Sequence, residues 1–321
     1  MGRKFIILLA TFFIVLNVML VVMVLLRDTS PPARPLPNPN GYDDFVKAAT
    51  VLNATDGTAL ALVTPEQITA MVNSSSKMTN RTQYSDKMTQ PELTAFLTDG
   101  AEALRLAREG LAKECRVDLR SFSGTPPPAL TELSTWKRLE NLFLAEGRLA
   151  VLEGRTNDAV AAYLDGIHFA QESARGGLVI SRLVGIACEA MNLKPLASLV
   201  DGLSATNCRA LAAALESVDT REEPIQVTLN QDSAWDRKQY GLRGQIEKLL
   251  TFKQNKNSLD KFVANDQTRT RERRQLAITA AARAYEMEKG KQPQSAADLV
   301  PEYLKAVPKD PATGNAMTLG P

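Results

Sequence analysis

Hydrophobic residues recur at helical spacing along most of the chain after Gly41, and they almost nowhere alternate as they would in a β-strand. Short stretches rich in glycine, proline, asparagine and aspartate separate these apolar stripes. The pattern predicts helices over residues 90–114, 129–153, 157–174, 178–203, 206–218, 225–254 and 258–289. We therefore expect an all-α fold, either a helical bundle or a short superhelix.

The N-terminal segment has a different pattern, with an almost uninterrupted apolar run from Phe5 to Leu26. A helix of about 20 apolar residues spans the hydrocarbon core of a bilayer. The run is too long for a cleaved signal peptide, and no small-residue cleavage site follows it. We predict that residues 1–27 form a single-pass transmembrane signal anchor. The basic pair at positions 3 and 4 favours a cytoplasmic N-terminus and an extracytoplasmic soluble domain.

Prolines at every second or third position follow in residues 28–41. Proline at this density favours the extended polyproline II conformation, so this segment is predicted to be a semi-rigid linker. The remaining chain is divided into a helical domain over 42–257 and a C-terminal helix with a short tail over 258–321. The linker would hold the helical domain away from the bilayer.

Composition excludes several classes of function. The formal net charge is +2 and aromatic residues make up 6% of the chain, which gives no reason to expect a nucleic-acid partner. The only histidine, His168, rules out a metal site with several histidine ligands. No phosphate-binding, dinucleotide-binding, nucleophile or zinc-protease motif is present. We therefore predict no catalytic residue, cofactor or metal, and interpret Cys115, Cys188 and Cys208 as small buried hydrophobic residues.

Three charged features have simple structural interpretations. Arg269 and Arg273 lie four residues apart in the arginine-rich stretch 268–276, which predicts a solvated helix face. The alternative is a basic patch that faces an acidic envelope polymer or partner. The acidic pair at 222–223 precedes a proline, which is typical of a helix start. Glu172 lies four residues after the histidine and is expected to pair with it.

The segment 141–167 has small residues at positions where two helices would meet. Gly147 and Ala159 are twelve residues apart, Tyr163 follows four residues later, and Gly154 lies between the two predicted helices. Small side chains at this spacing allow close contact between the helices of a hairpin. A second, weaker copy is suggested by Gly185 and Ala197, again twelve residues apart.

This spacing resembles that of a tetratricopeptide hairpin. The resemblance extends over about residues 140–174, and Phe143 stands where that family usually has a large aromatic residue. It implies a helix-turn-helix unit of the kind that stacks into protein-binding superhelices. One good copy and one weaker copy leave a plain bundle and a superhelix equally open.

The C-terminal tail has regularly placed turn residues. Tyr285 lies on the last predicted helix, Gly290 and Pro293 are expected to end that helix, and Ser295 is expected to cap a short helix. Asp310, Pro311 and Gly314 predict a final turn. The same order of residues is similar to the C-terminal part of type II secretion major pseudopilins. The pilin leader is missing, and the chain ends where the calcium-binding strands of that family lie, so neither pilus assembly nor a calcium site is implied.

The whole layout resembles a group of uncharacterised bacterial membrane-anchored proteins, which implies no activity. We expect an interaction or scaffold protein of the cell envelope, with an unidentified protein partner bound beside helices 141–153 and 178–192. An accessory role in a secretion or pilus-like system is the alternative that the tail suggests. An enzyme with an unrecognised carboxylate site is the third hypothesis.

Overall fold

The computed structural model describes residues 35–55, 88–119, 128–250 and 252–320, and the isolated residues 16 and 19. The predicted anchor, apart from those two positions, and residues 28–34 of the linker lie outside the described residues. Regular structure in the described ranges is helical, and one isolated β-bridge joins Lys309 to Ala316. The predicted all-α fold is confirmed.

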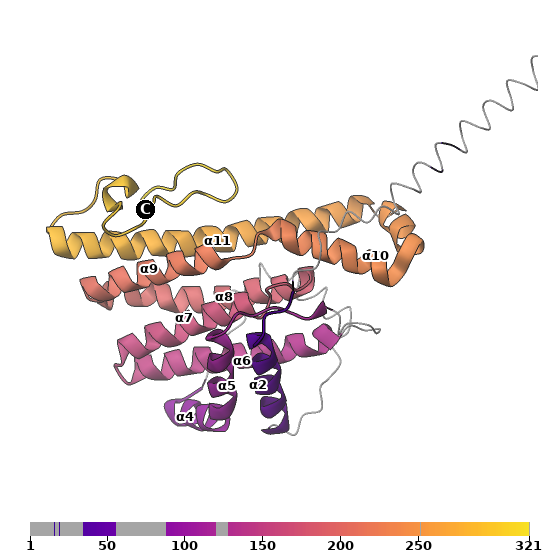
Figure 1. The fold of residues 1–321 in the computed structure, drawn as a ribbon. Helices are drawn as coiled ribbons and strands as arrows, with labels where there is room; N and C mark the ends of the chain where they lie inside the picture. Colours follow the sequence, from indigo (N-terminus) through magenta and orange to yellow (C-terminus); the bar gives the residue numbers. More distant parts are fainter. Residues whose placement is uncertain are drawn as a thin grey trace, which may run out of the picture.

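The helices are arranged as a stack with a smaller group beside it (Figure 1). They are α2 (Gly41–Thr55), α4 (Gln90–Asp99), α5 (Ala101–Leu111), α6 (Pro128–Leu152), α7 (Thr156–Glu172), α8 (Val179–Leu199), α9 (Ala205–Arg221), α10 (Ile225–Leu250) and α11 (Phe252–Lys289), with the short 3-10 helices η4 (Val200–Gly202) and η5 (Ala296–Leu299). α11 lies on α9 and α8, α8 lies on α7, and α7 lies on α6. α2, α4 and α5 pack against α6, and α5 also contacts α7.

Two hydrophobic cores hold these layers together. The core around α2, α5 and α6 is aromatic, and the ring of Phe169 lies 5.0 Å from Phe45 and 5.7 Å from Phe143 between centroids. The other core joins α7, α8, α9 and α11 and consists mainly of alanine and leucine. Small side chains in the second core allow the helices of the stack to approach closely.

The predicted helix over 90–114 is divided in two, which its pattern of hydrophobic residues did not indicate. Gly100 lies between α4 and α5 with φ −89° and ψ 0°, and α5 ends at Leu111. A Cβ atom on Gly100 would lie 2.3 Å from a methyl group of Leu142 on α6. The chain therefore turns where α6 packs against it.

The predicted hairpin at 140–174 is formed by α6 and α7. Gly154 ends the turn between them with φ +73°, a conformation that favours glycine. A Cβ on Gly147 would lie 2.4 Å from the ring of Tyr163, so the tyrosine packs directly on the α6 backbone. Ala159 is fully buried in the same contact region.

The prediction of a second hairpin is wrong. Gly185 and Ala197 belong to a single helix, α8, which continues through Pro195. Ala197 is exposed, so it contacts no facing helix in the way that the hairpin required. Proline at an internal position removes only one backbone hydrogen bond, and the packing of α8 on both sides maintains the helix.

Gly185 nevertheless has a packing role. A Cβ at this position would lie 2.5 Å from the carbonyl oxygen of Ala170 on α7. We expect Gly185→Ala to lower the free energy of unfolding by about 1–3 kcal/mol, because a backbone oxygen cannot move aside as a flexible side chain can. Chemical denaturation should show this loss. Gly202→Ala is the control, since a Cβ there would meet nothing within 4 Å; equal losses in both variants would contradict the packing role.

Within the described ranges, one helix is long and apolar enough to cross a membrane, the mid-chain segment Val179–Gly202. Its position differs from that of the predicted N-terminal anchor. This helix carries buried polar side chains. Arg182 and Glu189 contact α11, and Asn192 contacts α6. Such polar contacts on several sides are those of a core helix in a globular body.

The last residue of the predicted linker segment before α2 is attached to the helical body. Asn40 is buried, and its side-chain amide donates to the carbonyl oxygen of Arg116 at 2.8 Å and accepts from the backbone N–H of Arg116 at 3.0 Å. The backbone N–H of Gly41 donates to the carbonyl of Glu114 at 2.9 Å. The free length of the linker therefore ends at about residue 39.

The C-terminal tail packs on its own chain. Tyr303 and Leu304 are buried in the alanine-rich core, and the guanidinium of Arg209 on α9 lies 4.1 Å from the Tyr303 ring centroid. Ser295 and Asp298 form the capping box of η5. The predicted domain boundary at 257/258 falls inside α11, so the tail and the helical domain share one core.

Candidate functional site

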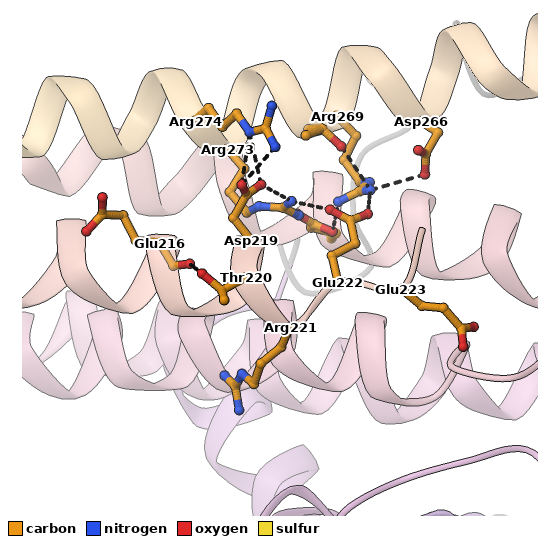
Figure 2. Close-up of polar contacts among 12 residues, drawn as sticks. Glu216, Asp219, Thr220, Arg221, Glu222, Glu223, Asp266, Arg269, Arg273 and Arg274 are labelled. Atoms are coloured by element: carbon orange, nitrogen blue, oxygen red, sulfur yellow. Dashed lines mark hydrogen bonds and ion pairs between the residues drawn. The ribbon is translucent and has the colours of Figure 1, made fainter. Parts of the chain in front are cut away.

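A buried cluster of charged residues joins α8, α9 and α11, and we call it the arginine–carboxylate network (Figure 2). Its basic members are four arginines and its acidic members are four carboxylates. They are Arg182, Arg269, Arg273 and Arg274 with Glu189, Asp219, Glu222 and Asp266. The charges balance within the network, so the fold holds them without a net buried charge.

Arg273 is the centre of the network and is fully buried. One guanidinium nitrogen donates to Glu189 of α8 at 2.6 Å, and the other donates to Asp219 of α9 at 2.6 Å and to Glu222. A single side chain of α11 thus joins the two helices beneath it. The planar fork of arginine suits this role because its donors point to fixed positions.

Arg269 and Arg182 extend the network toward the start of α11. Arg269 donates to both Glu189 and Glu222, and Arg182 of α8 donates to Glu222 and, at 3.0 Å, to Asp266. Glu222 caps the C-terminal end of α9 and receives three arginines. The end of α9 is therefore fixed between α8 and α11.

The ionisation of Glu222 follows from these contacts. Burial by itself would raise the pKa of this carboxyl, but the charges of Arg269, Arg273 and Arg182 lower the pKa to about 2. The carboxylate is therefore ionised throughout the physiological range, and both of its oxygens accept from arginines. A carboxylate held in this way acts as a structural anion rather than as a general base.

The network corrects one sequence interpretation and adds to another. The stretch 268–276 is neither a solvated face nor a basic patch at its centre, since Arg269 is 3% exposed and Arg273 is 0% exposed. The acidic pair 222–223 does precede a helix, since α10 begins at Ile225, but its side chains contact arginines of other segments.

The sequence held a signal that could have identified this cluster. Among the buried positions on α11, one stripe at helical spacing consists of Phe262, Asp266, Arg269, Arg273, Leu276, Ala280 and Ala284. The two arginines continue the apolar stripe instead of lying opposite to it. Charged residues on the apolar face of a helix indicate buried ion pairs with neighbouring elements. Their partners on α8 and at the end of α9 could not be inferred, because they lie 47 to 84 residues away in the sequence. Folding alone brings them together.

A second buried polar pair lies between α6 and α8 and was not predicted. Glu140 and Asn192 are both fully buried, and the Asn192 amide nitrogen donates to Glu140 Oε1. Glu140 Oε2 and Asn192 Oδ1 have no other partner in the described structure. Burial raises the pKa of Glu140 well above its ordinary value of 4.5, against the opposing effect of the Asn192 hydrogen bond. A proton on Oε2 would remove the buried negative charge and give the carboxyl a hydrogen-bond donor.

Gly166 of α7 makes room for this pair. A Cβ at Gly166 would lie 2.6 Å from the Asn192 nitrogen and 2.7 Å from Glu140 Oε1. The three helices α6, α7 and α8 thus meet around two polar side chains. The pair is enclosed by protein, which gives it no contact with a solute in this conformation.

The remaining single residues have structural positions. Cys115, Cys188 and Cys208 are buried and free, as interpreted from the sequence. His168 Nε2 lies 3.7 Å from Glu172 Oε1. The same carboxylate accepts two bonds from Arg175 at 2.7 Å, so the histidine belongs to a group at the end of α7.

The predicted tail residues form two separate contacts. The ring of Tyr285 on α11 lies 5.5 Å from the ring of Tyr303 in the tail. Gly290, with φ +67°, follows the last residue of α11. Asp310 accepts from the backbone of residues 312 and 313 and from Arg271 at 2.6 Å, and Gly314 completes the turn with φ +74°. Pro293 lies between the end of α11 and η5, and Pro311 lies inside the turn from Asp310 to Gly314. The turn is therefore attached to α11.

An open groove lies on the other side of the body, between α4, α5 and α6. Its volume is about 580 Å³. Leu97 and Leu104 form an apolar floor, and Arg105, Arg108 and Glu146 form a charged rim. Arg108 is held at the rim by Asp165 at 2.8 Å and by Glu146. We call this surface the α4–α6 groove.

Comparison with known proteins identifies no relative, since no family model, curated protein or solved structure matches this chain. The tetratricopeptide and pseudopilin resemblances therefore stay predictions.

Proposed function

We propose that this protein is a membrane-anchored interaction or scaffold protein whose helical body is presented outside the cytoplasm. The observation that carries the proposal is the arginine–carboxylate network, in which charged residues of three helices neutralise one another inside the body. Buried ion pairs of this kind fix the relative positions of helices. A rigid framework of helices supports binding at its surface.

The α4–α6 groove is the surface that best fits a partner. Its floor is apolar and its rim carries both charge signs, the combination expected where a protein segment binds. The predicted surface beside 141–153 and 178–192 is less suitable, because α6 and α8 contact each other there through Glu140 and Asn192. We therefore place the proposed binding surface at the α4–α6 groove instead.

Site-specific photocrosslinking tests the proposal in cells. A photoreactive residue replaces Ala101, which is exposed at the groove, in one variant and Ala213, which is exposed on α9, in the other. We expect Ala101 to crosslink to a distinct protein and Ala213 to give no such adduct. Both positions are exposed alanines in helices, so the folded body should tolerate either change.

Two outcomes would contradict the proposal. The same adducts at both positions would indicate non-specific contact rather than binding in the groove. Absence of any protein adduct, together with turnover of a substrate by the purified chain, would favour the enzyme hypothesis. Adducts with secretion-system components would support the narrower accessory role.

A further inference from the structure

The end of the molecule formed by α10 and the start of α11 extends beyond the helical stack (Figure 1). α10 contacts α8 and α11, whereas its second half lies past the other helices. Gly241, with φ +52° and ψ −145°, interrupts α10 immediately after Tyr240. The chain therefore bends at the projecting end.

Exposed aromatic and apolar side chains gather at this end. Tyr240 is 51% exposed and Leu259 of α11 is 41% exposed. The ring of Trp235 lies 6.0 Å from that of Tyr240 in an edge-to-face arrangement, so the two aromatic residues form one unit. Tryptophan and tyrosine are the residues that prefer the boundary between water and a bilayer.

Positive charge surrounds these residues. The sequence from 235 to 261 has seven basic and three acidic residues and a net charge of +4, whereas the whole chain carries only +2. Lys238, Lys256 and Lys261 are exposed in the described structure. We define the tip surface as these three lysines with Trp235, Tyr240 and Leu259.

The predicted anchor would keep the tip surface near a membrane. Residues 28–39 separate the anchor from Asn40, which is attached to the body. Twelve residues in an extended proline-rich conformation reach about 37 Å. Asn40 therefore stays within about 37 Å of the bilayer, a distance shorter than α11 itself, whose 38 residues extend over about 57 Å.

We propose that the tip surface docks on the anionic headgroups of a lipid bilayer. The aromatic pair would lie at the boundary between headgroups and acyl chains, and the lysines would contact the lipid phosphates. The anchor raises the local concentration of bilayer at the tip, so a weak surface is sufficient. Docking would set the orientation of the helical body above the membrane. This inference rests on the anchor in the proposed function.

The two tryptophans of the chain make the docking measurable. Trp136 is 2% exposed in the aromatic core, whereas Trp235 belongs to the tip surface. The full chain is reconstituted into phosphatidylcholine vesicles with or without phosphatidylglycerol, and each set contains a lipid with a quencher near the headgroup. We expect at least twofold stronger quenching in the anionic vesicles, and we expect high salt to remove the difference.

Two variants identify the source of the signal. Trp235→Phe leaves only the buried tryptophan and should lose the quenching in both vesicle types. The triple variant Lys238→Glu, Lys256→Glu and Lys261→Glu should lose the difference between anionic and neutral vesicles. Equal quenching of the wild type in both vesicle types, or an unchanged difference in the triple variant, would overturn the proposal.

Flotation of the same samples separates this inference from the anchor. Flotation with neutral vesicles reports insertion of residues 1–27. If insertion fails, the proposed anchored state is wrong, and excess anionic vesicles still test the tip surface by quenching. If insertion succeeds without lipid-dependent quenching, the anchor stands and the tip surface does not bind lipid.

Discussion

Replacing Arg273 with alanine is expected to lower the free energy of unfolding by about 3–5 kcal/mol. The side chain is fully buried and joins Glu189, Asp219 and Glu222. Its removal would leave carboxylates inside the protein without one of their cations, and burying an unpaired charge costs far more than the pair gains. Urea or guanidinium unfolding, followed by circular dichroism, would measure the loss.

Arg271 provides a matched control two residues away on the same helix. Its side chain is 47% exposed and pairs with Asp310 at the surface. Arg271→Ala should cost about 0–1 kcal/mol, because solvent screens an exposed ion pair and both side chains lose entropy in forming it. Similar losses for the two arginines would show that burial does not determine the role of Arg273.

A double-mutant cycle would separate ion pairing from packing. Arg273→Ala and Glu189→Ala are combined, and the coupling between them should be about 0.5–3 kcal/mol, since the two side chains contact each other at 2.6 Å. Additive losses would mean that the guanidinium stabilises the fold through its hydrocarbon chain alone.

Replacing Glu140 with glutamine should change how stability depends on pH. Burial raises the pKa of Glu140 in the folded state above its ordinary value of 4.5. Above about pH 4.5 the unfolded chain releases this proton while the folded chain keeps it, so the wild type loses stability as the pH rises toward the folded pKa. The loss is about 1.4 kcal/mol for each pH unit in that window.

Glutamine removes this loss because it is neutral at every pH and can donate a hydrogen bond as a protonated carboxyl would. The stability of Glu140→Gln relative to wild type should therefore increase with pH above pH 5, by about 1.4 kcal/mol for each pH unit below the folded pKa of Glu140. Denaturant unfolding of both proteins across this range gives the difference directly.

Glu146→Gln is the control on the same helix, because its carboxylate lies at the open rim of the groove. The pH dependence of that variant should follow the wild type closely. A constant difference between Glu140→Gln and wild type from pH 5 to pH 7 would show that Glu140 is ionised in the folded protein.

The helical stripes predicted most of the fold, because helix periodicity is a local property of the sequence. Sequence predicted the α6–α7 hairpin and the glycine that ends α11, where small residues and turn residues have a direct steric meaning. It failed at Gly100, where α6 makes the chain turn, and in the second hairpin, because Gly185 and Ala197 lie on one helix, α8, that neighbouring helices maintain. Both errors come from contacts with residues distant in the sequence.

The candidate site shows the same division more sharply. From the sequence we predicted a helical chain and a membrane anchor over the first 27 residues, and we recognised charged residues at helical spacing on 268–276. The fold shows that Arg269 and Arg273 face inward, because burial depends on which helices cover that face. It likewise shows that Glu140 lies against Asn192, 52 residues later in the chain. An ion pair or a shifted pKa is a property of neighbours in space, and the fold alone brings those neighbours together.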